Sequence, residues 1–211
     1  MQQPPLTKKY QAKIAVGFLV VALTMIEMFL IPRSYFVLGS LVATTCMICV
    51  AFLVHPNLTS LFRPTPKTIA IGVVTAVLLY LIFVAGNAVV KSVSPLGVSA
   101  SNENSIYSLF ASTPFLLRVV VFILDAFGFE SYFRGVLQPI LAARIGVGSV
   151  FAVALIDAAI HISSFNPLFV ITTFIADSVW GLNFYFAKDL SSNIANHLLW
   201  DVLIFIVIPI A

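Results

Sequence analysis

Long apolar stretches alternate with short polar segments along the whole chain. Three such stretches, at about 14–31, 35–54 and 69–90, occupy the first half. Four more, at about 114–144, 149–163, 168–187 and 191–210, occupy the second half. A helix needs roughly 20 mostly apolar residues to cross a bilayer. The pattern therefore predicts an all-α, polytopic transmembrane helix bundle with about seven spans, or six to eight because Pro139 is a candidate break in the fourth stretch.

The least apolar stretch, residues 91–113, divides the chain into two parts. It contains Pro95, Gly97 and a run of serine and asparagine residues around Glu103, which predicts a water-exposed loop with a short interfacial helix at about 106–110. We therefore predict N-terminal helices and this loop in 1–113, and a chemically richer helical core in 114–211. The two parts are expected to form one membrane domain, since the chain is too short to add a soluble one.

Composition agrees with this pattern, because 61% of the 211 residues are hydrophobic and only 9% are charged. Soluble domains carry about 25% charged residues, so this chain has too little polar surface for a water-soluble globule. The formal net charge of +3 is small and its basic residues are scattered. These features indicate the lipid bilayer as a partner and argue against nucleic acid.

The lysines and arginines between the spans predict the orientation of the chain, because cytoplasmic loops carry an excess of them. With the N-terminus inside, only Arg33, Lys91 and Arg118 fall on the outer side. The inner side then carries most of the basic residues: Lys8, Lys9, Lys13, Arg63, Lys67, Arg144 and Lys188. We predict a multi-pass protein of a prokaryotic plasma (inner) membrane with a cytoplasmic N-terminus.

Ionisable side chains gather inside the predicted spans. Of the eight acids, only Glu103 and Asp189 fall in predicted loops. A charge at the bilayer centre costs about 2.5–3.5 kcal/mol on insertion scales, so such residues point to pairing or function. Three spans of the second half each carry two of them four residues apart, which places each pair on one helix face. The pairs are Glu130 with Arg134, Asp157 with His161, and His197 with Asp201.

We expect the three pairs to face one another around a water-accessible cavity. Asp125 precedes Glu130 by five residues, so it is turned partly away from that pair and lies one helical turn before Phe129. The remaining acids within spans, Glu27 and Asp177, are expected to be interhelical partners rather than catalytic groups.

These pairs carry a resemblance to a known family. Residues 129–135 read FESYFRG, which resembles the Glu-Glu-x-x-Phe-Arg-Gly motif of the CAAX protease and bacteriocin-processing (CPBP) family of intramembrane proteases. His161 matches the family's second motif, Phe-x-x-x-His, although Asp157 replaces its phenylalanine. Residues 197–201 read HLLWD and match the third motif, His-x-x-x-Asn/Asp. The resemblance covers about residues 114–208.

The resemblance implies a helical endopeptidase that cleaves a membrane-bound peptide or a prenylated, lipid-anchored protein. By its pattern, His161 would help to activate a water, and His197 with Asp201 would serve the oxyanion. Glu130 and Arg134 would form a support pair. No cofactor is expected; zinc held by the two histidines and Glu130 is the less favoured alternative.

Phe129 departs from the family, because it occupies the position of the water-activating glutamate. A phenyl ring cannot accept a proton, so the base must come from elsewhere. Glu130 could turn into this role, or Asp157 or Asp125 could supply it. A carboxylate inside such a cavity suits general-base catalysis.

Two other functions follow from the same residues. A relative without catalysis would keep the cavity and bind a peptide or membrane partner, as in bacteriocin immunity or regulation. A small proton-coupled transporter would use the acids and histidines as a relay. The sequence shows no inverted repeat, which counts against the transporter.

Overall fold

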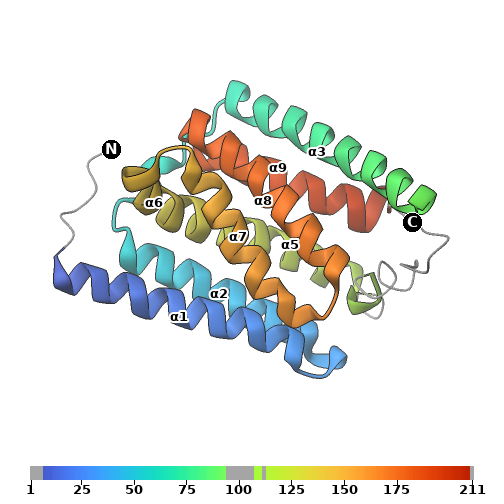
Figure 1. Cartoon of the computed structure of the whole chain (residues 1–211), viewed down its shortest axis with the longest axis horizontal. Helices are drawn as coiled ribbons and strands as arrows, with labels where there is room; N and C mark the ends of the chain where they lie inside the picture. The colour runs from blue at the N-terminus through green and yellow to red at the C-terminus, as the bar shows by residue number, and fades with distance from the viewer. Residues whose placement is uncertain (1–6, 94–106, 111–112, 210–211) are drawn as a thin grey trace.

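The computed structural model describes residues 7–93, 107–110 and 113–209, and all further structural statements concern these residues (Figure 1). The described part of the chain is 89% helical and contains no strand. The predicted all-α helix bundle is therefore confirmed. Of the predicted interfacial helix at 106–110, residues 107–110 are helical. Residues 91–93 of the predicted loop are also helical, at the end of the preceding helix, and residues 94–106 lie outside the described residues.

The first half forms three long helices close to their predicted positions. They are α1 (Lys8–Leu30), α2 (Phe36–Val54) and α3 (Pro66–Val93). Thr7 caps α1, because its hydroxyl accepts a hydrogen bond from the Tyr10 backbone N–H at 3.2 Å. Satisfying a free N–H in this way fixes where a helix begins.

The fourth apolar stretch is one continuous helical segment with a π-helical centre. Its parts are α5 (Phe115–Phe129), the π-helix η4 (Glu130–Leu137) and α6 (Gln138–Ile145). Pro139 does not break it; this residue sits in the first turn of α6, directly after the π-helix. π-Helical turns are rare and occur frequently at functional sites. Here the π-helix covers the motif residues from Glu130 to Gly135.

The last three apolar stretches form α7 (Gly148–His161), α8 (Pro167–Ala187) and α9 (Leu190–Val202). The 3-10 helix η5 (Ile162–Ser164) extends α7, and the π-helix η6 (Leu203–Val207) extends α9. Two of the helices begin at a side-chain N-cap. Asn166 accepts a hydrogen bond from Phe169 N–H at 3.1 Å, and Asp189 accepts one from Ser191 N–H at 2.6 Å. These caps set the starts of α8 and α9, and hence the positions of their site residues.

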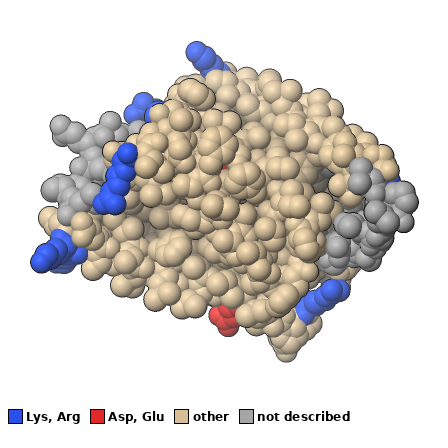
Figure 2. Space-filling model, in the orientation of Figure 1, with Lys and Arg blue, Asp and Glu red and all other residues tan. Residues whose placement is uncertain are grey.

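The surface is that of a membrane protein. Within the described residues, five helices are long and apolar enough to cross a bilayer. In the view of Figure 2, Lys and Arg side chains lie mainly toward the ends of the molecule and leave a broad middle that is largely uncharged. The seven-span count, the orientation of the chain and the plasma membrane stay predictions.

Helix contacts bring the two halves together. At Gly72 the backbones of α3 and α9 come so close that an added Cβ would clash with the Ser192 carbonyl oxygen. Small residues at such points allow close helix packing in membranes. The acid Glu27, which was expected to bind a neighbouring helix, is instead exposed on α1, three residues before its end, where a long side chain can reach the bilayer surface.

Candidate active site

A cavity of about 280 Å³ lies inside the bundle. Its lining is mostly apolar and aromatic, with residues from α1, α2, α3, α5, α7, α8 and α9. Ile82 of α3 and Ile171 of α8 line it and are also exposed, at 47% and 56%, on the outer surface. The cavity therefore reaches the lateral surface between α3 and α8. Its ionisable lining residues are Asp125, Asp157, His161, His197 and Asp201.

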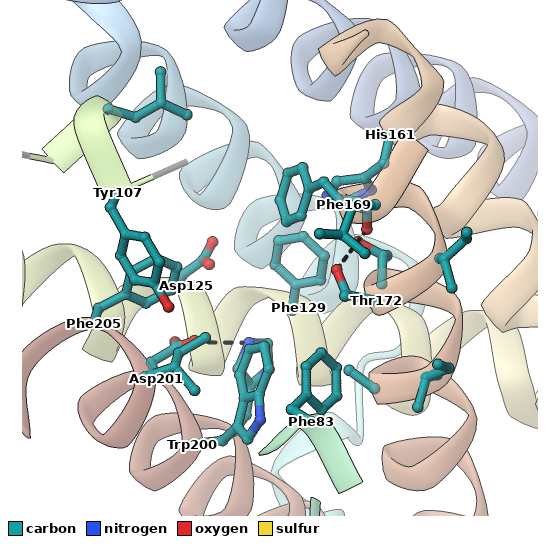
Figure 3. Close-up of a pocket in the computed structure, with 18 of the residues that line it drawn as sticks. Phe83, Tyr107, Asp125, Phe129, His161, Phe169, Thr172, Trp200, Asp201 and Phe205 are labelled. Atoms are coloured by element: carbon teal, nitrogen blue, oxygen red, sulfur yellow. Dashed lines mark hydrogen bonds and ion pairs between the residues drawn. The ribbon is translucent and has the colours of Figure 1, made fainter. Parts of the chain in front are cut away.

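Phe129 stands in the middle of this cavity. Its ring centroid is 6.4 Å from that of His161 and 5.8 Å from that of His197. Figure 3 shows Asp125 and Asp201 on one side of the Phe129 ring and His161 with Phe169 on the other. The position that holds a glutamate in the resembled motif thus lies between the two acid–histidine pairs.

Glu130 lies behind the cavity wall rather than in the cavity. Its side chain is fully buried and does not line the cavity. One carboxylate oxygen, Oε1, accepts from His197 Nδ1 at 3.0 Å. The other, Oε2, accepts from Asn193 Nδ2 at 2.8 Å and lies 3.5 Å from Arg134 Nε. The expectation that all three pairs face the cavity is wrong for the Glu130–Arg134 pair.

Arg134 joins this network to α8. Its Nη2 donates to the Asp177 carboxylate at 2.7 Å and to the Asp177 carbonyl oxygen at 2.9 Å. The guanidinium therefore lies between two fully buried acids, Glu130 and Asp177. The predicted pairing of Glu130 with Arg134 is confirmed, as is the interhelical role of Asp177. A buried charge without such partners would be very costly.

His197 is held in one orientation by two neighbours. Its Nδ1 donates to Glu130, and its ring stacks on Trp180 with centroids 3.8 Å apart and planes 17° apart. Because Nδ1 is occupied, Nε2 is the nitrogen that faces the cavity side. Nε2 lies 3.8 Å from Asp201 Oδ2, one helical turn further along α9.

Asp125 approaches the same place from α5. Its Oδ1 accepts from the Thr44 hydroxyl of α2 at 3.1 Å. One potential ligand atom each of Asp125, His197 and Asp201 lies within 4.8 Å of the other two. We call these three residues the DHD cluster. Asp125 lies one helical turn before Phe129, as expected. Its position in the sequence did not predict that it would lie beside His197 and Asp201.

The second pair, Asp157 and His161, is confined to one helix. His161 Nδ1 donates to the Asp157 carbonyl oxygen at 2.9 Å and lies 3.3 Å from its carboxylate Oδ1. The His161 ring also packs edge-on against Phe169, with centroids 5.0 Å apart. This arrangement leaves His161 Nε2 for a molecule in the cavity.

Sequence reasoning missed three supporting residues. Asn193 lies one turn before His197 on α9 and binds both Glu130 and the Trp180 carbonyl oxygen, each at 2.8 Å. Its four-residue spacing from His197 was the available signal. Trp180 and Thr44 gave no such signal, because their role depends on how α8 and α2 pack against the motif helices.

A metal ion would find its ligands in the DHD cluster. The fold does not bring together the ligand set suggested by the sequence, which was both histidines with Glu130. Glu130 does not line the cavity, and the Phe129 ring separates His161 from His197. Imidazole nitrogen and carboxylate oxygen are both zinc ligands. The residues of the cluster therefore fit a metal chemically.

Comparison with known proteins bears on the second half of the chain. Searches of curated proteins and of solved structures give no match. A sequence model of the family described as type II CAAX prenyl endopeptidase Rce1-like matches residues 111–203. That range contains η4, the Asp157–His161 pair and the DHD cluster. The resemblance seen in the sequence is thereby confirmed: residues 111–203 match the model of the Rce1-like type II CAAX prenyl endopeptidases.

Proposed function

We propose that the protein is an intramembrane endopeptidase that hydrolyses a peptide bond in a membrane-associated substrate. The observation that carries the proposal is the cavity with two acid–histidine pairs facing each other across Phe129. An apolar cavity with a few convergent polar groups is the usual form of a binding or active site. The family match over residues 111–203 supports a protease function for the two pairs.

The Asp157–His161 pair is proposed to activate the water. Asp157 holds Nδ1–H of His161, so Nε2 can take a proton from water, as the histidine does in an acid–histidine–nucleophile triad. The water oxygen bonds to the carbonyl carbon, and the carbonyl π electrons move to its oxygen. His161 then gives the proton to the leaving nitrogen as the C–N bond breaks, which yields a carboxylic acid and an amine.

The DHD cluster is proposed to serve the carbonyl oxygen. It lies on the other side of Phe129, where His197 is fixed by Glu130 and Trp180. His197 in its doubly protonated form, or a cation bound by the cluster, would stabilise the oxyanion of the tetrahedral intermediate at this place. Groups fixed in this way before the reaction often supply the largest part of catalysis.

The substrate is proposed to enter sideways from the bilayer. The cavity reaches the lateral surface between α3 and α8, where Ile82 and Ile171 are exposed. A peptide next to a lipid anchor, such as a prenylated C-terminal segment, has the apolar character that this aromatic cavity accepts. The family description, which names prenyl endopeptidases, supports this class of substrate.

A second function deserves a test because of Phe129. A protein that binds a membrane peptide without cleaving it would need the cavity but not the glutamate of the first motif. Phe129 is 7% exposed and packs against Phe133 with ring centroids 5.3 Å apart, so it completes an apolar surface. This arrangement would suit binding alone.

Cleavage of a membrane-anchored peptide by purified protein in nanodiscs separates the two functions. Wild type should release the product, His161→Ala should not, and Glu130→Gln should be weakened through the loss of His197 orientation. Phe129→Glu tests whether the missing glutamate limits the reaction. An inert wild type combined with an active Phe129→Glu variant would refute the protease proposal and favour a binding protein.

A further inference from the structure

We propose that the DHD cluster of Asp125, His197 and Asp201 is a binding site for one divalent transition-metal ion of the zinc type. The ligand atoms come from α5 and α9 and lie within 4.8 Å of one another. Zinc is bound by imidazole nitrogen and carboxylate oxygen at about 2.0–2.2 Å, so its ligand atoms are about 3.5 Å apart. Small side-chain rotations of the two aspartates would bring the ligand atoms from within 4.8 Å of one another to this separation.

The histidine is prepared as a ligand by its surroundings. Its Nδ1 donates to the Glu130 carboxylate, which in the neutral ring leaves the lone pair on Nε2. A histidine that binds a metal almost always donates its other N–H to a carboxylate, a carbonyl or water. Thr44 orients Asp125 in a similar way, through a hydrogen bond of 3.1 Å to Oδ1.

Asp201 provides an independent observation that points to a cation ligand. This residue is only 4% exposed, and within the described part of the chain its Oδ2 has no hydrogen-bond partner. That oxygen is turned toward His197 Nε2, at 3.8 Å. A buried carboxylate oxygen without a partner is costly. Three hydrogen-bond acceptors, each with a lone pair to share, thus converge on one point, and a cation between them would satisfy all three.

The surrounding charges make a cation at this point favourable. Five acids lie within the described helices around the site: Asp125, Glu130, Asp157, Asp177 and Asp201. The guanidinium of Arg134 is already bound to Glu130 and Asp177. The DHD cluster therefore receives no compensation from Arg134.

Three protein ligands leave a coordination position for a water or a carbonyl oxygen. The cluster lines the cavity, so that position faces the bound peptide. The role of the ion as the group that polarises the scissile carbonyl rests on the proposed function. The binding of the ion does not rest on the proposed function, and it can be measured without substrate.

The test is the binding of Zn²⁺ alone to the full-length protein in detergent, after chelator treatment. Metal content after dialysis and the visible spectrum of the Co²⁺ form report stoichiometry and ligands. We expect about one Zn²⁺ per chain. Asp125→Asn and Asp201→Asn should each weaken binding at least 10-fold. Asp157→Asn is the matched control, because it removes an acid of the same cavity outside the cluster; circular dichroism checks that each variant folds.

Each outcome decides the proposal. Zinc binding that is lost in both cluster variants and kept in Asp157→Asn supports it. The proposal is overturned if wild type binds no zinc, if the cluster variants bind as well as wild type, or if Asp157→Asn loses binding equally. Mg²⁺ binding as tight as that of Zn²⁺ would also overturn it, because His197 would then not be a ligand. Zinc binding without peptide cleavage would refute the protease function while leaving the metal site intact.

Discussion

The two acid–histidine pairs of the cavity have the same spacing in the sequence and different surroundings in the fold. Asp157 and His161 bind each other within α7, through contacts of 2.9 and 3.3 Å. His197 is instead fixed from other helices, by Glu130 of η4 and Trp180 of α8. Asp201 of its own helix is 3.8 Å away. The comparison teaches that a self-contained pair suits a general base, whereas a pair supported from several helices suits a fixed electrostatic role.

The largest expected effect concerns the proposed base. His161→Ala should lower kcat/KM for a membrane peptide by about 10²–10⁴-fold, the usual contribution of general acid–base catalysis. His55→Ala is the matched control, since this histidine follows α2 outside the cavity lining. Equal activity of His161→Ala and wild type would show that the Asp157–His161 pair is not the general base.

The next effect concerns the network behind His197. Arg134→Met should lower the free energy of unfolding by about 3–5 kcal/mol, because it leaves the buried carboxylates Glu130 and Asp177 without their cation. Chemical unfolding in detergent measures it. Arg144→Met changes an exposed arginine of α6 and should shift stability by less than about 0.5 kcal/mol. Similar small losses in both variants would show that the network does not support the fold.

A smaller effect tests how α9 is placed. Gly72→Ala should destabilise the protein by about 1–3 kcal/mol, because its Cβ would clash with the Ser192 carbonyl oxygen of α9. Gly86 lies on the same helix, and an added Cβ there meets nothing within 4 Å. Gly86→Ala should therefore be neutral or stabilising by up to about 1 kcal/mol. Thermal unfolding that ranks the two variants in the opposite order would contradict the close contact of α3 with α9.

The smallest effect concerns the orientation of Asp125. Thr44→Val keeps the shape of the side chain but removes the hydrogen bond to Asp125 Oδ1. A net hydrogen bond is worth about 0.5–1.5 kcal/mol, so kcat/KM should fall roughly 2–10-fold. Thr45→Val removes only a bond to the Leu41 carbonyl oxygen of the same helix and should leave kcat/KM unchanged. A loss in the Thr45 variant alone would argue against a role for Asp125.

Hydrophobic patterning predicted the helices well, because long apolar runs in a bilayer have few alternatives to helix. It did not predict the π-helix at Glu130–Leu137, since that geometry depends on how the motif helix packs. Four-residue spacing correctly paired Glu130 with Arg134, Asp157 with His161, and His197 with Asp201. It could not show that Glu130 faces away from the cavity.

Contacts between distant segments were out of reach of the sequence. Thr44 and Asp125 are 81 positions apart, and Glu130 and His197 are 67 apart. Only the packing of α2, α5 and α9 brings these residues together. For the same reason the spacing pointed to both histidines as metal ligands, whereas the fold gathers His197 with two aspartates.

The central claim is that the two pairs act in one catalytic step. A double-mutant cycle in kcat/KM with His161→Ala, His197→Ala and the double variant tests this claim most directly. Groups that act as a unit give strongly non-additive losses, so the double variant should be about as impaired as the more impaired single variant. Losses that multiply across the two variants, or a His197→Ala variant as active as wild type, would contradict it.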